Sequence, residues 1–428
     1  MVKLRAGALK VELRAVRILY VTPLWSGFRD ALFCGTEARG MPAFVLPLRQ
    51  MIRLGYEVDL IVASPELHEL DIGVEWLEES QIQITHWNIG TKIGSLESYM
   101  RLQNVIDSAL TTKDYDFVYG HGSIGAIANK VALRRGVPVG VRLYGTFLAR
   151  DLSCKMPNSK WKRQCLKTRC FLRHPLEYQC FTLPKEFLLV TNDGTKADYV
   201  YSQIGKKTYR WLFWLNGCSK PCQGDNEDMH SLDQAVGIFS EKRTFLLYPA
   251  RIARWKRQHL AIELLAKINR CEGMQLDLVF AGHVTDEDYY KHLNKLVQTY
   301  GLSGNVHFLG PISRDELHLL YKRCLAVLSF YDVSNLGNVA IEALSNGCIL
   351  IGMNDGSLDS LIVNGEAGFL VDNIDEAVAV IEGLLSNENL RRKIQFSAMN
   401  VANLKIATWD MRIKKEIQLI RQCVDGTL

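Results

Sequence analysis

The chain has 428 residues, of which 48% are hydrophobic and 23% are charged, and these are ordinary proportions for globular proteins. This length predicts two or three domains, and no apolar run reaches the ~18 residues that a membrane-spanning helix needs. The 11 cysteines are an odd number, and charged residues interrupt any secretory signal at the basic N-terminus. We therefore expect a cytoplasmic protein with reduced thiols rather than a disulfide framework.

The charge is unevenly distributed. Residues 1–210 contain 29 Lys and Arg against 20 Asp and Glu, a net charge of +9, whereas the remainder contains 22 against 26, a net charge of −4. A positively charged first half attracts anions, which favours an anionic acceptor or an anionic membrane that presents it.

Strands and helices alternate along the first half. Strands are predicted over residues 17–21, 55–62, 115–119 and 137–143, and helices over residues 42–54 and 124–135. Each strand is a short, mostly apolar run, and Pro42 suits the first turn of a helix. This alternation predicts a parallel, doubly wound α/β sheet.

Residues 120–125 read Gly-His-Gly-Ser-Ile-Gly, which fits the G-x-G-x-x-G pattern of dinucleotide-binding turns. The motif follows a strand and opens a helix, but no Asp or Glu lies between Asp116 and Asp151 to hold a ribose. Arg142 could instead contact the extra phosphate of NADP. We favour the alternative interpretation, a tight strand-to-helix turn that lines a cleft.

The segment from Arg150 to Arg173 contains eight Lys or Arg and a single acid, Asp151. Apolar side chains are interleaved with the cations at Trp161, Leu166, Phe171 and Leu172. A basic segment with apolar side chains can lie on an anionic bilayer. An inert, solvated insertion remains the alternative, and RNA is disfavoured because no recognised RNA-binding module accompanies the segment.

Cysteines cluster in the same region at Cys154, Cys165, Cys170 and Cys180, and a further pair is Cys218 and Cys222. The four cysteines lack the close pairs typical of structural zinc sites, and the separate pair stands alone. Scattered thiols are therefore favoured over zinc.

The alternation restarts at residues 244–248 after an irregular stretch, and two cations, Arg251 and Lys256, follow that strand. Residues 324–330 form another apolar run that leads into a polar turn with Gly337 and then into a helix that carries Glu342. Free backbone N–H groups converge where a glycine turn enters a helix. An arginine fork and a lysine point charge beside such amides indicate a diphosphate site.

These motifs resemble, in order and spacing, a retaining glycosyltransferase of the GT-B fold, glycosyltransferase family 4 (glycosyl transferases group 1). The resemblance covers roughly residues 17–80 and 185–425. The matching positions are Asn216-Gly217 with the family's "NG" loop, Arg251, Lys256, Gly282, residues 306–310 with "V-x-F-x-G", Glu342 with the second Glu of E-x7-E, residues 365–371 with "G-x-x-G-x-L-V", and Thr408-Trp409 with "S-W".

The resemblance implies two Rossmann-like, doubly wound domains that face a cleft. An acceptor-binding domain would span residues 1–215, with the basic insertion at 150–185, and a linker would span 216–240. A nucleotide-sugar domain would span 241–405, and residues 406–428 would form a helix that crosses back to the first domain.

The implied activity is transfer of a sugar from a nucleotide sugar, either a UDP- or a GDP-sugar, with retention of configuration and without a metal or cofactor. The basic first half favours a cell-envelope glycan or a lipid-linked precursor as the acceptor, and the enzyme would be cytoplasmic, with peripheral association with the inner face of the plasma membrane as an option. Two alternatives remain: a non-catalytic glycosyltransferase-like partner or glycan-binding subunit, and a GT-B nucleotide-sugar 2-epimerase.

The resemblance also implies roles for particular residues. Arg251 and Lys256 would stabilise the leaving diphosphate, and Glu342 would hold the ribose hydroxyls. The donor would further contact Gly310, Pro311, Ile312, Asn335, Leu336, Gly337, Asn338 and Val339. The acceptor would lie against Gly40, Tyr144 and Asp193.

Two departures from the family pattern concern the sugar. Ser334 stands where the family has the first Glu of E-x7-E, and Asp332 is the nearest carboxylate in sequence. Tyr144 stands where many members have a His that contacts the donor sugar. We expect Asp332 and Ser334 to belong to the catalytic set with Arg251 and Lys256.

Overall fold

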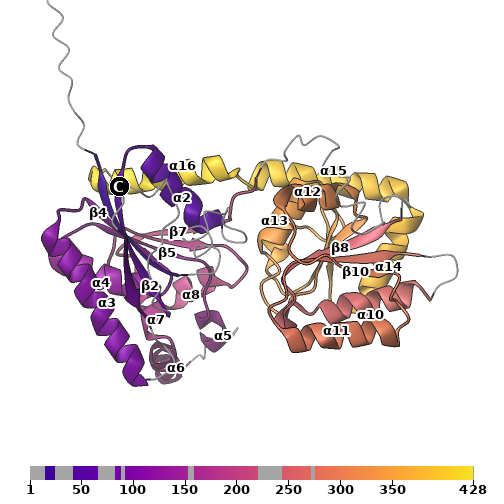
Figure 1. Ribbon diagram of the computed structural model, residues 1–428, viewed down its shortest axis with the longest axis horizontal. Helices are drawn as coiled ribbons and strands as arrows, with labels where there is room; N and C mark the ends of the chain where they lie inside the picture. The colour runs from indigo at the N-terminus through magenta and orange to yellow at the C-terminus, as the bar shows by residue number, and fades with distance from the viewer. Residues whose placement is uncertain are drawn as a thin grey trace, which may run out of the picture.

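The computed structural model describes residues 15–24, 42–65, 82–87, 92–152, 159–219, 243–270 and 275–427. They form two α/β lobes that lie side by side (Figure 1). The chain passes from the first lobe towards the second after β7, and the helix pair at its C-terminal end runs along both lobes and ends on the first.

The first lobe contains a parallel seven-stranded sheet with the strand order β3-β2-β1-β4-β5-β6-β7. Its strands are β1 Arg17–Pro23, β2 Glu57–Ser64, β3 Ile82–His86, β4 Phe117–His121, β5 Val139–Leu143, β6 Phe187–Thr191 and β7 Arg210–Trp214. The central strands β4, β5 and β6 are buried along their whole length, as strands covered by helices on both faces must be.

Helices cover both faces of this sheet. They are α2 Pro42–Arg53, α3 Lys92–Thr112, α4 Gly125–Arg135, α5 Leu148–Leu152, α6 Lys160–Arg173, α7 Pro175–Thr182, α8 Ala197–Ile204 and α16 Trp409–Val424. The apolar face of α16 packs with α2 on one face of the sheet, while α3 and α4 cover the other. The last helix of the chain is therefore part of the first lobe's core.

The second lobe contains a parallel six-stranded sheet with the order β10-β9-β8-β11-β12-β13. Its strands are β8 Phe245–Pro249, β9 Asp277–Ala281, β10 Val306–Phe308, β11 Ala326–Ser329, β12 Leu350–Met353 and β13 Phe369–Val371. Its helices are the short η2 Arg254–Lys256 and η3 Leu358–Ser360, with α10 Gln258–Ile268, α11 Glu287–Thr299, α12 Arg314–Arg323, α13 Asn338–Ser345, α14 Ile374–Ser386 and α15 Glu388–Lys405.

Both sheets reverse their strand order at one place, between β1 and β4 in the first and between β8 and β11 in the second. Open α/β sheets bind ligands at the carboxyl ends of strands beside such a switch point. The loops after β8 and β11 contain Arg251, Lys256 and residues 331–337. The fold thus brings together the two segments that the sequence singles out.

The two lobes touch at this edge. The Ser334 hydroxyl donates to the backbone carbonyl of Asp193, and the Asn216 side-chain amide donates to Asn338 Oδ1 at 2.8 Å. A Cβ placed on Gly194 would lie 2.6 Å from Ser357 Cβ, so the backbone after β6 lies directly against the second lobe. The carboxyl ends of the two sheets therefore face each other.

The G-x-G-x-x-G segment is a packing turn. A Cβ on Gly120 would lie 2.7 Å from the Cα of Gly125, so these two glycines allow α4 to lie against the end of β4. Arg142, the candidate reader of an NADP phosphate, is fully buried and paired with Glu416. This geometry supports the tight-turn interpretation. It also shows that Arg142 is not available to bind the phosphate of a dinucleotide.

Candidate active site

The two cations after β8 lie beside two aromatic rings. Lys256 Nζ lies 3.2 Å from the ring centroid of Tyr331 and 4.0 Å from that of Trp255. Arg251 is exposed, and its carbonyl accepts a hydrogen bond of 2.8 Å from the buried Gln258 side chain, which fixes the backbone after the strand. The rings hold the ammonium group by cation–π attraction without neutralising its charge.

Burial and the neighbouring Arg251 together lower the pKa of Lys256 to about 7. Within the described residues neither cation forms an ion pair with a carboxylate. Like charges without a counter-ion repel each other, and an anion that binds between them removes this cost. The local chemistry therefore favours an anionic ligand.

The turn after β11 is shaped by a buried amide. The Asn335 side chain accepts hydrogen bonds from Ser329 Oγ at 2.9 Å and from the Tyr331 N–H at 3.0 Å, and it donates to the Tyr331 carbonyl at 3.2 Å. Leu336 is buried as well, and its N–H donates to Ser357 Oγ at 3.1 Å. The Asn335 side chain and the Leu336 N–H thus hold the turn, and the predicted contact of these two residues with the donor stays a prediction.

The start of α13 presents free amides. Gly337 precedes the helix, a Cβ on it would meet only open space, and no hydrogen-bond acceptor among the described residues takes the N–H groups of Gly337, Asn338 and Val339. Such N–H groups, at the positive end of the helix dipole, are suited to bind phosphate oxygens. They lie on the same edge as the two cations because β8 and β11 are neighbours.

Glu342 lies one turn further along α13. It is half-buried and accepts a hydrogen bond of 3.0 Å from the Tyr321 hydroxyl, and burial raises its pKa. One carboxylate can accept several hydrogen bonds, so capacity remains for the two hydroxyls that the sequence analysis assigned to it.

Ser334 and Asp332 have different surroundings. Ser334 adopts the left-handed conformation with φ of 67°, and its hydroxyl is bonded to the first lobe at Asp193. Asp332 is exposed, and its N–H donates to the Trp255 carbonyl at 3.0 Å, which ties it to the turn that carries Lys256. Asp332 therefore presents a carboxylate near the cations, whereas Ser334 forms a contact between the lobes.

Asp193 lies across the interface on the first lobe. Its Oδ1 accepts hydrogen bonds from the Thr195 hydroxyl at 2.7 Å and from the Thr195 N–H at 3.1 Å. Burial raises the pKa of this carboxyl to about 6, although the two hydrogen bonds oppose the shift. It is a second carboxylate at the facing edges of the lobes.

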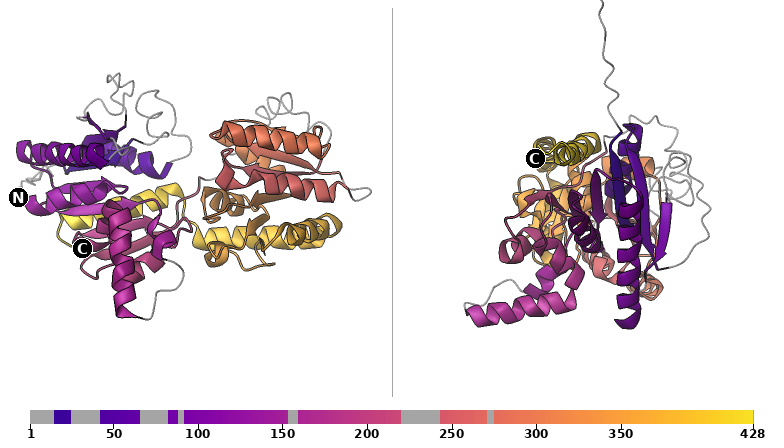
Figure 2. Two further views of the ribbon diagram at one scale, coloured as in Figure 1. Left: turned by 90° about the horizontal axis from the view of Figure 1, so that it is seen from below. Right: turned by 90° about the vertical axis from the view of Figure 1, so that its left-hand side faces the viewer.

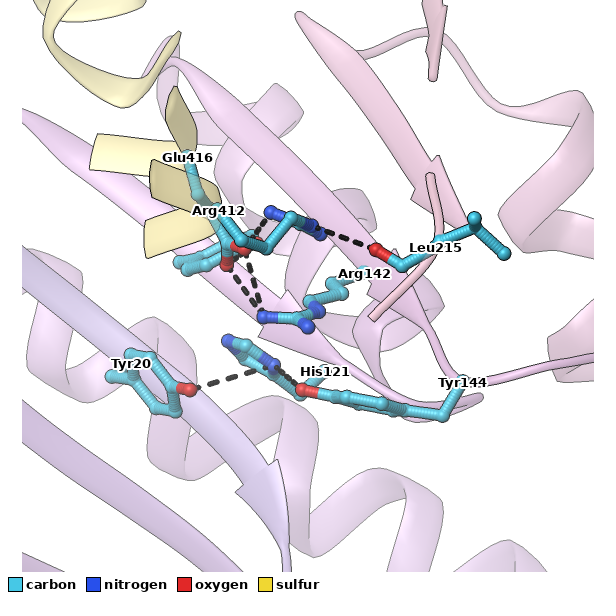
Figure 3. A network of polar contacts seen from close by, with 8 residues as sticks. Tyr20, His121, Arg142, Tyr144, Leu215, Arg412 and Glu416 are labelled. Atoms are coloured by element: carbon cyan, nitrogen blue, oxygen red, sulfur yellow. Dashed lines mark hydrogen bonds and ion pairs between the residues drawn. The ribbon is translucent and has the colours of Figure 1, made fainter. Parts of the chain in front are cut away.

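The hydroxyl of Tyr144 points into the first lobe rather than towards the second (Figure 3). It lies 2.8 Å from His121 Nδ1, and the Arg142 guanidinium lies 4.9 Å from the Tyr144 ring centroid. Burial, helped by the charge of Arg142, lowers the pKa of His121 well below its usual value. A neutral imidazole thus fixes the orientation of the tyrosine.

Behind Tyr144 lies a buried ionic cluster (Figure 3). Arg142 donates to both oxygens of Glu416 at 2.7 and 2.9 Å, and Arg412 donates to the same carboxylate at 2.8 Å. Arg412 also donates to the Leu215 carbonyl at 3.3 Å. The C-terminal helix is therefore bonded both to the sheet of the first lobe and to the segment that leaves it.

The remaining predicted site residues follow β10 in the second lobe or lie outside the residues that the structure describes. Gly310, with φ of 68°, accepts a hydrogen bond of 2.8 Å from the Gly282 N–H, Pro311 is exposed and Ile312 is half-buried. Gly40 lies outside the described residues. Within the described residues no cluster of His, Cys, Asp or Glu is arranged to hold a metal, and no helix there is long and apolar enough to cross a membrane.

Several residues of the site were not predicted. Trp255 and Tyr331 enclose Lys256, Tyr321 holds Glu342, and His121 holds Tyr144. The aromatic residues beside Lys256 and at the end of the apolar run were the available signals in the sequence. The other two partners come from distant elements and leave no local pattern.

Parts of the chain are similar to known proteins. Residues 231–400 match the family model "Glycosyl transferases group 1". The putative glycosyltransferase EpsD of Bacillus subtilis is 25% identical over 86% of this chain and 90% of its own length. The D-inositol 3-phosphate glycosyltransferase of Corynebacterium urealyticum is 27% identical, but the match spans only 41% of this chain and 42% of that enzyme.

Among solved structures, Alr3699/HepE of Anabaena in complex with UDP and glucose aligns with a TM-score of 0.65 at 17% identity. The alignment covers 94% of this chain and 98% of that one. With its two facing parallel sheets, the chain therefore has the GT-B fold of glycosyltransferases.

Proposed function

We propose that this protein is a retaining glycosyltransferase that moves a sugar from a UDP- or GDP-sugar to a cell-envelope glycan or lipid-linked precursor. The observation that carries the proposal is the pairing of two uncompensated cations, Arg251 and Lys256, with the free amides at the start of α13. All of them lie at the switch point of the second sheet. The match of residues 231–400 to a glycosyltransferase family model supports the same assignment.

Sugar transfer builds negative charge on the leaving phosphate. The bond between the anomeric carbon and the phosphate oxygen breaks and its electron pair goes to that oxygen. The acceptor hydroxyl then bonds to the anomeric carbon and releases its proton. Fixed cations and amides at the phosphate stabilise this charge more in the transition state than in the ground state. Arg251, Lys256 and the α13 amides would supply that stabilisation.

The activity is tested by incubating the protein with UDP-, GDP-, ADP- and TDP-sugars and following release of the nucleoside diphosphate. We expect one donor class to be consumed, and NMR of the sugar product to show the donor's anomeric configuration. Inversion would overturn the retaining assignment. An epimerised nucleotide sugar formed without an acceptor would favour the 2-epimerase, and absence of turnover with every donor and acceptor fraction would favour the non-catalytic partner.

Lys256 makes nucleotide binding depend on pH. Its pKa is about 7 in the free protein, and a bound diphosphate raises it because the anion favours the charged form. Binding above pH 7 therefore takes up a proton, and affinity falls as the pH rises above about 7, until the pH passes the raised pKa of the complex. Calorimetry in buffers of different ionisation enthalpy measures this uptake.

Lys256→Arg is the matched control, because a guanidinium stays charged throughout this range. We expect the proton uptake to disappear in this variant. Equal uptake in both proteins would mean that another group titrates and that Lys256 does not contact the phosphates.

Asp332 is the candidate replacement for the missing family carboxylate. Asp332→Asn is expected to lower kcat and kcat/KM by equal factors and to leave nucleoside diphosphate affinity unchanged, because its charge acts on the sugar in the transition state. Steady-state kinetics and calorimetry measure the two effects. The same substitution at Asp288, which is exposed on α11, is the control and should change neither. Collapse of nucleotide binding in Asp332→Asn would make this residue structural.

A further inference from the structure

Helix α6 projects from the first lobe in both views of Figure 2, where it is the magenta helix that extends away from the body. Its first six residues, 160–165, are exposed on every side, and it packs on α5 and α7 only through its second half. Leu166 and Cys170 supply apolar contact with the lobe, and the ring centroid of Phe171 lies 5.7 Å from that of Tyr178 in α7. The helix is therefore held at one end and open to solvent along the rest.

The outer face of α6 carries a stripe of uncharged residues that has a large apolar side chain at each end. Trp161, Cys165, Thr168 and Leu172 follow one another at intervals of four, three and four residues, the spacing that keeps side chains on one face of a helix. At 100° per residue this stripe lies roughly 140° around the helix from Leu166 and Cys170. Trp161 is 74% exposed and Leu172 is 72% exposed, so the stripe points to solvent.

Cations flank this stripe on both sides. The helix contains six Lys and Arg and no acid, at Lys160, Lys162, Arg163, Lys167, Arg169 and Arg173. Lys162, Arg169 and Arg173 project from one side of the stripe, and Lys160 and Lys167 project from the other. In the described part of the chain Arg173 pairs with Asp151, and no ion pair is recorded for Lys160, Lys162, Lys167 or Arg169.

We propose that α6 docks on an anionic phospholipid surface, with the stripe inserted between the headgroups and the cations against the phosphates. A large indole and a leucine on the outer face are costly in water and favourable at the boundary between headgroups and acyl chains. A single row of cations would suit any polyanion. The stripe between two rows of cations matches a bilayer surface, where anionic headgroups lie above apolar acyl chains.

The docked helix is connected to the facing edge of the lobes. In α7, the buried Glu177 accepts hydrogen bonds from the Thr146 hydroxyl and, at 2.8 Å, from the Phe147 N–H. These residues belong to the turn that follows Tyr144, and Phe147 is 66% exposed. Docking of α6 would therefore hold this turn near the bilayer, where a lipid-linked acceptor lies. This last link rests on the proposed function, whereas the docking itself does not.

The test uses the full-length protein and sedimentation with two kinds of vesicle. One is pure phosphatidylcholine, and the other is phosphatidylcholine mixed with phosphatidylglycerol. We expect binding only to the anionic vesicles and loss of binding as salt is raised, because surface charges are screened. Each cation at the surface strengthens binding by about fivefold, so four together decide whether the protein sediments.

Two variants separate charge from insertion. The charge variant replaces Lys160, Lys162, Lys167 and Arg169 with Ser, and the stripe variant replaces Trp161 and Leu172 with Ser. We expect the first to lose binding by about two orders of magnitude or more, and the second to lose at least tenfold at unchanged net charge. A matched control removes four exposed lysines elsewhere, Lys295, Lys322, Lys393 and Lys414, and should still bind.

All variants should keep the wild-type circular dichroism spectrum. They should also keep the wild-type affinity for nucleoside diphosphate, because the proposed nucleotide site lies in the other lobe. Retained vesicle binding with no nucleotide binding would leave the docking inference standing and overturn the proposed function. Equal binding to neutral vesicles, absence of binding to either kind, or equal loss in the control variant would overturn the docking inference. A short RNA that displaces the protein completely from anionic vesicles, and that binds the stripe variant and the wild type equally well, would also overturn the docking inference.

Discussion

Lys256→Ala is expected to lower the rate of sugar transfer by about 100-fold or more, the scale seen when a preorganised charge stabiliser is lost. The ammonium lies against Tyr331 and Trp255, and in the described residues it has no carboxylate partner. Its removal therefore breaks no ion pair and leaves only two rings to repack. Single-turnover kinetics with the donor identified by the nucleotide panel measures the loss.

Arg254→Ala is the matched control for this prediction. Arg254 lies in the same short turn, but it is exposed and interacts with Asp286 at 3.7 Å. We expect a change of less than about twofold, because exposed ion pairs contribute little. Arg251→Lys should be impaired, since the lysine loses the planar fork. Normal turnover of both Lys256→Ala and Arg251→Lys would remove the diphosphate site from this region.

Glu416→Gln is expected to lower the free energy of unfolding by about 3–5 kcal/mol, since it leaves Arg142 and Arg412 buried without their counter-ion. All three side chains are almost fully buried. Burial alone would raise the pKa of Glu416, but the two guanidinium groups outweigh it and hold that pKa below its usual value. The amide keeps the shape of the carboxylate and removes only its charge. Urea unfolding followed by circular dichroism measures the effect.

Glu388→Gln supplies the control on the surface. Glu388 pairs with Arg392 one turn away at 2.5 Å, and both side chains are largely exposed. The same chemical change should cost less than about 1 kcal/mol there. A Glu416→Gln variant as stable as this control would mean that the C-terminal helix is held by its apolar face alone.

The sequence analysis predicted several of the strands that are short apolar runs, but it did not name β6 or β7, whose residues are mostly apolar as well. The strand expected at residues 17–21 forms β1, and the one expected at 115–119 forms β4 two residues later. The shift arises because Tyr115 and Asp116 turn their side chains to Asp59 and to the Arg17 N–H before the strand begins. The edge strand β3 was not predicted, since its short run alternates polar and apolar residues with no distinct boundary.

The candidate site could be located from the sequence where its signal is local. Arg251, Lys256, Gly337 and Glu342 stand next to strand ends and helix starts, so their position follows from the alternation of elements. Asn335 looked like a ligand-facing polar residue, but its amide satisfies buried backbone groups of its own turn. That role depends on how deeply the turn is buried, which the local sequence does not indicate.

The contacts between distant segments could not be predicted at all. Ser334 bonds to Asp193 across the lobes, and Tyr144 lies against His121, whose pKa is lowered by burial and by Arg142. In each pair the two residues lie at or after the ends of different strands of the fold and are far apart in the sequence. Only the packing of two sheets and one returning helix brings them together.

The central claim is that the second lobe binds the diphosphate of a nucleotide sugar through Arg251 and Lys256. Calorimetric titration of the wild type and of Lys256→Ala with UDP, GDP, ADP and TDP tests it most directly. We predict that one or two of these nucleotides bind the wild type and that Lys256→Ala weakens that binding at least about tenfold, the loss of one charge-assisted contact. Equal affinity in the two proteins, or no binding of any of the four to the wild type, would contradict the account.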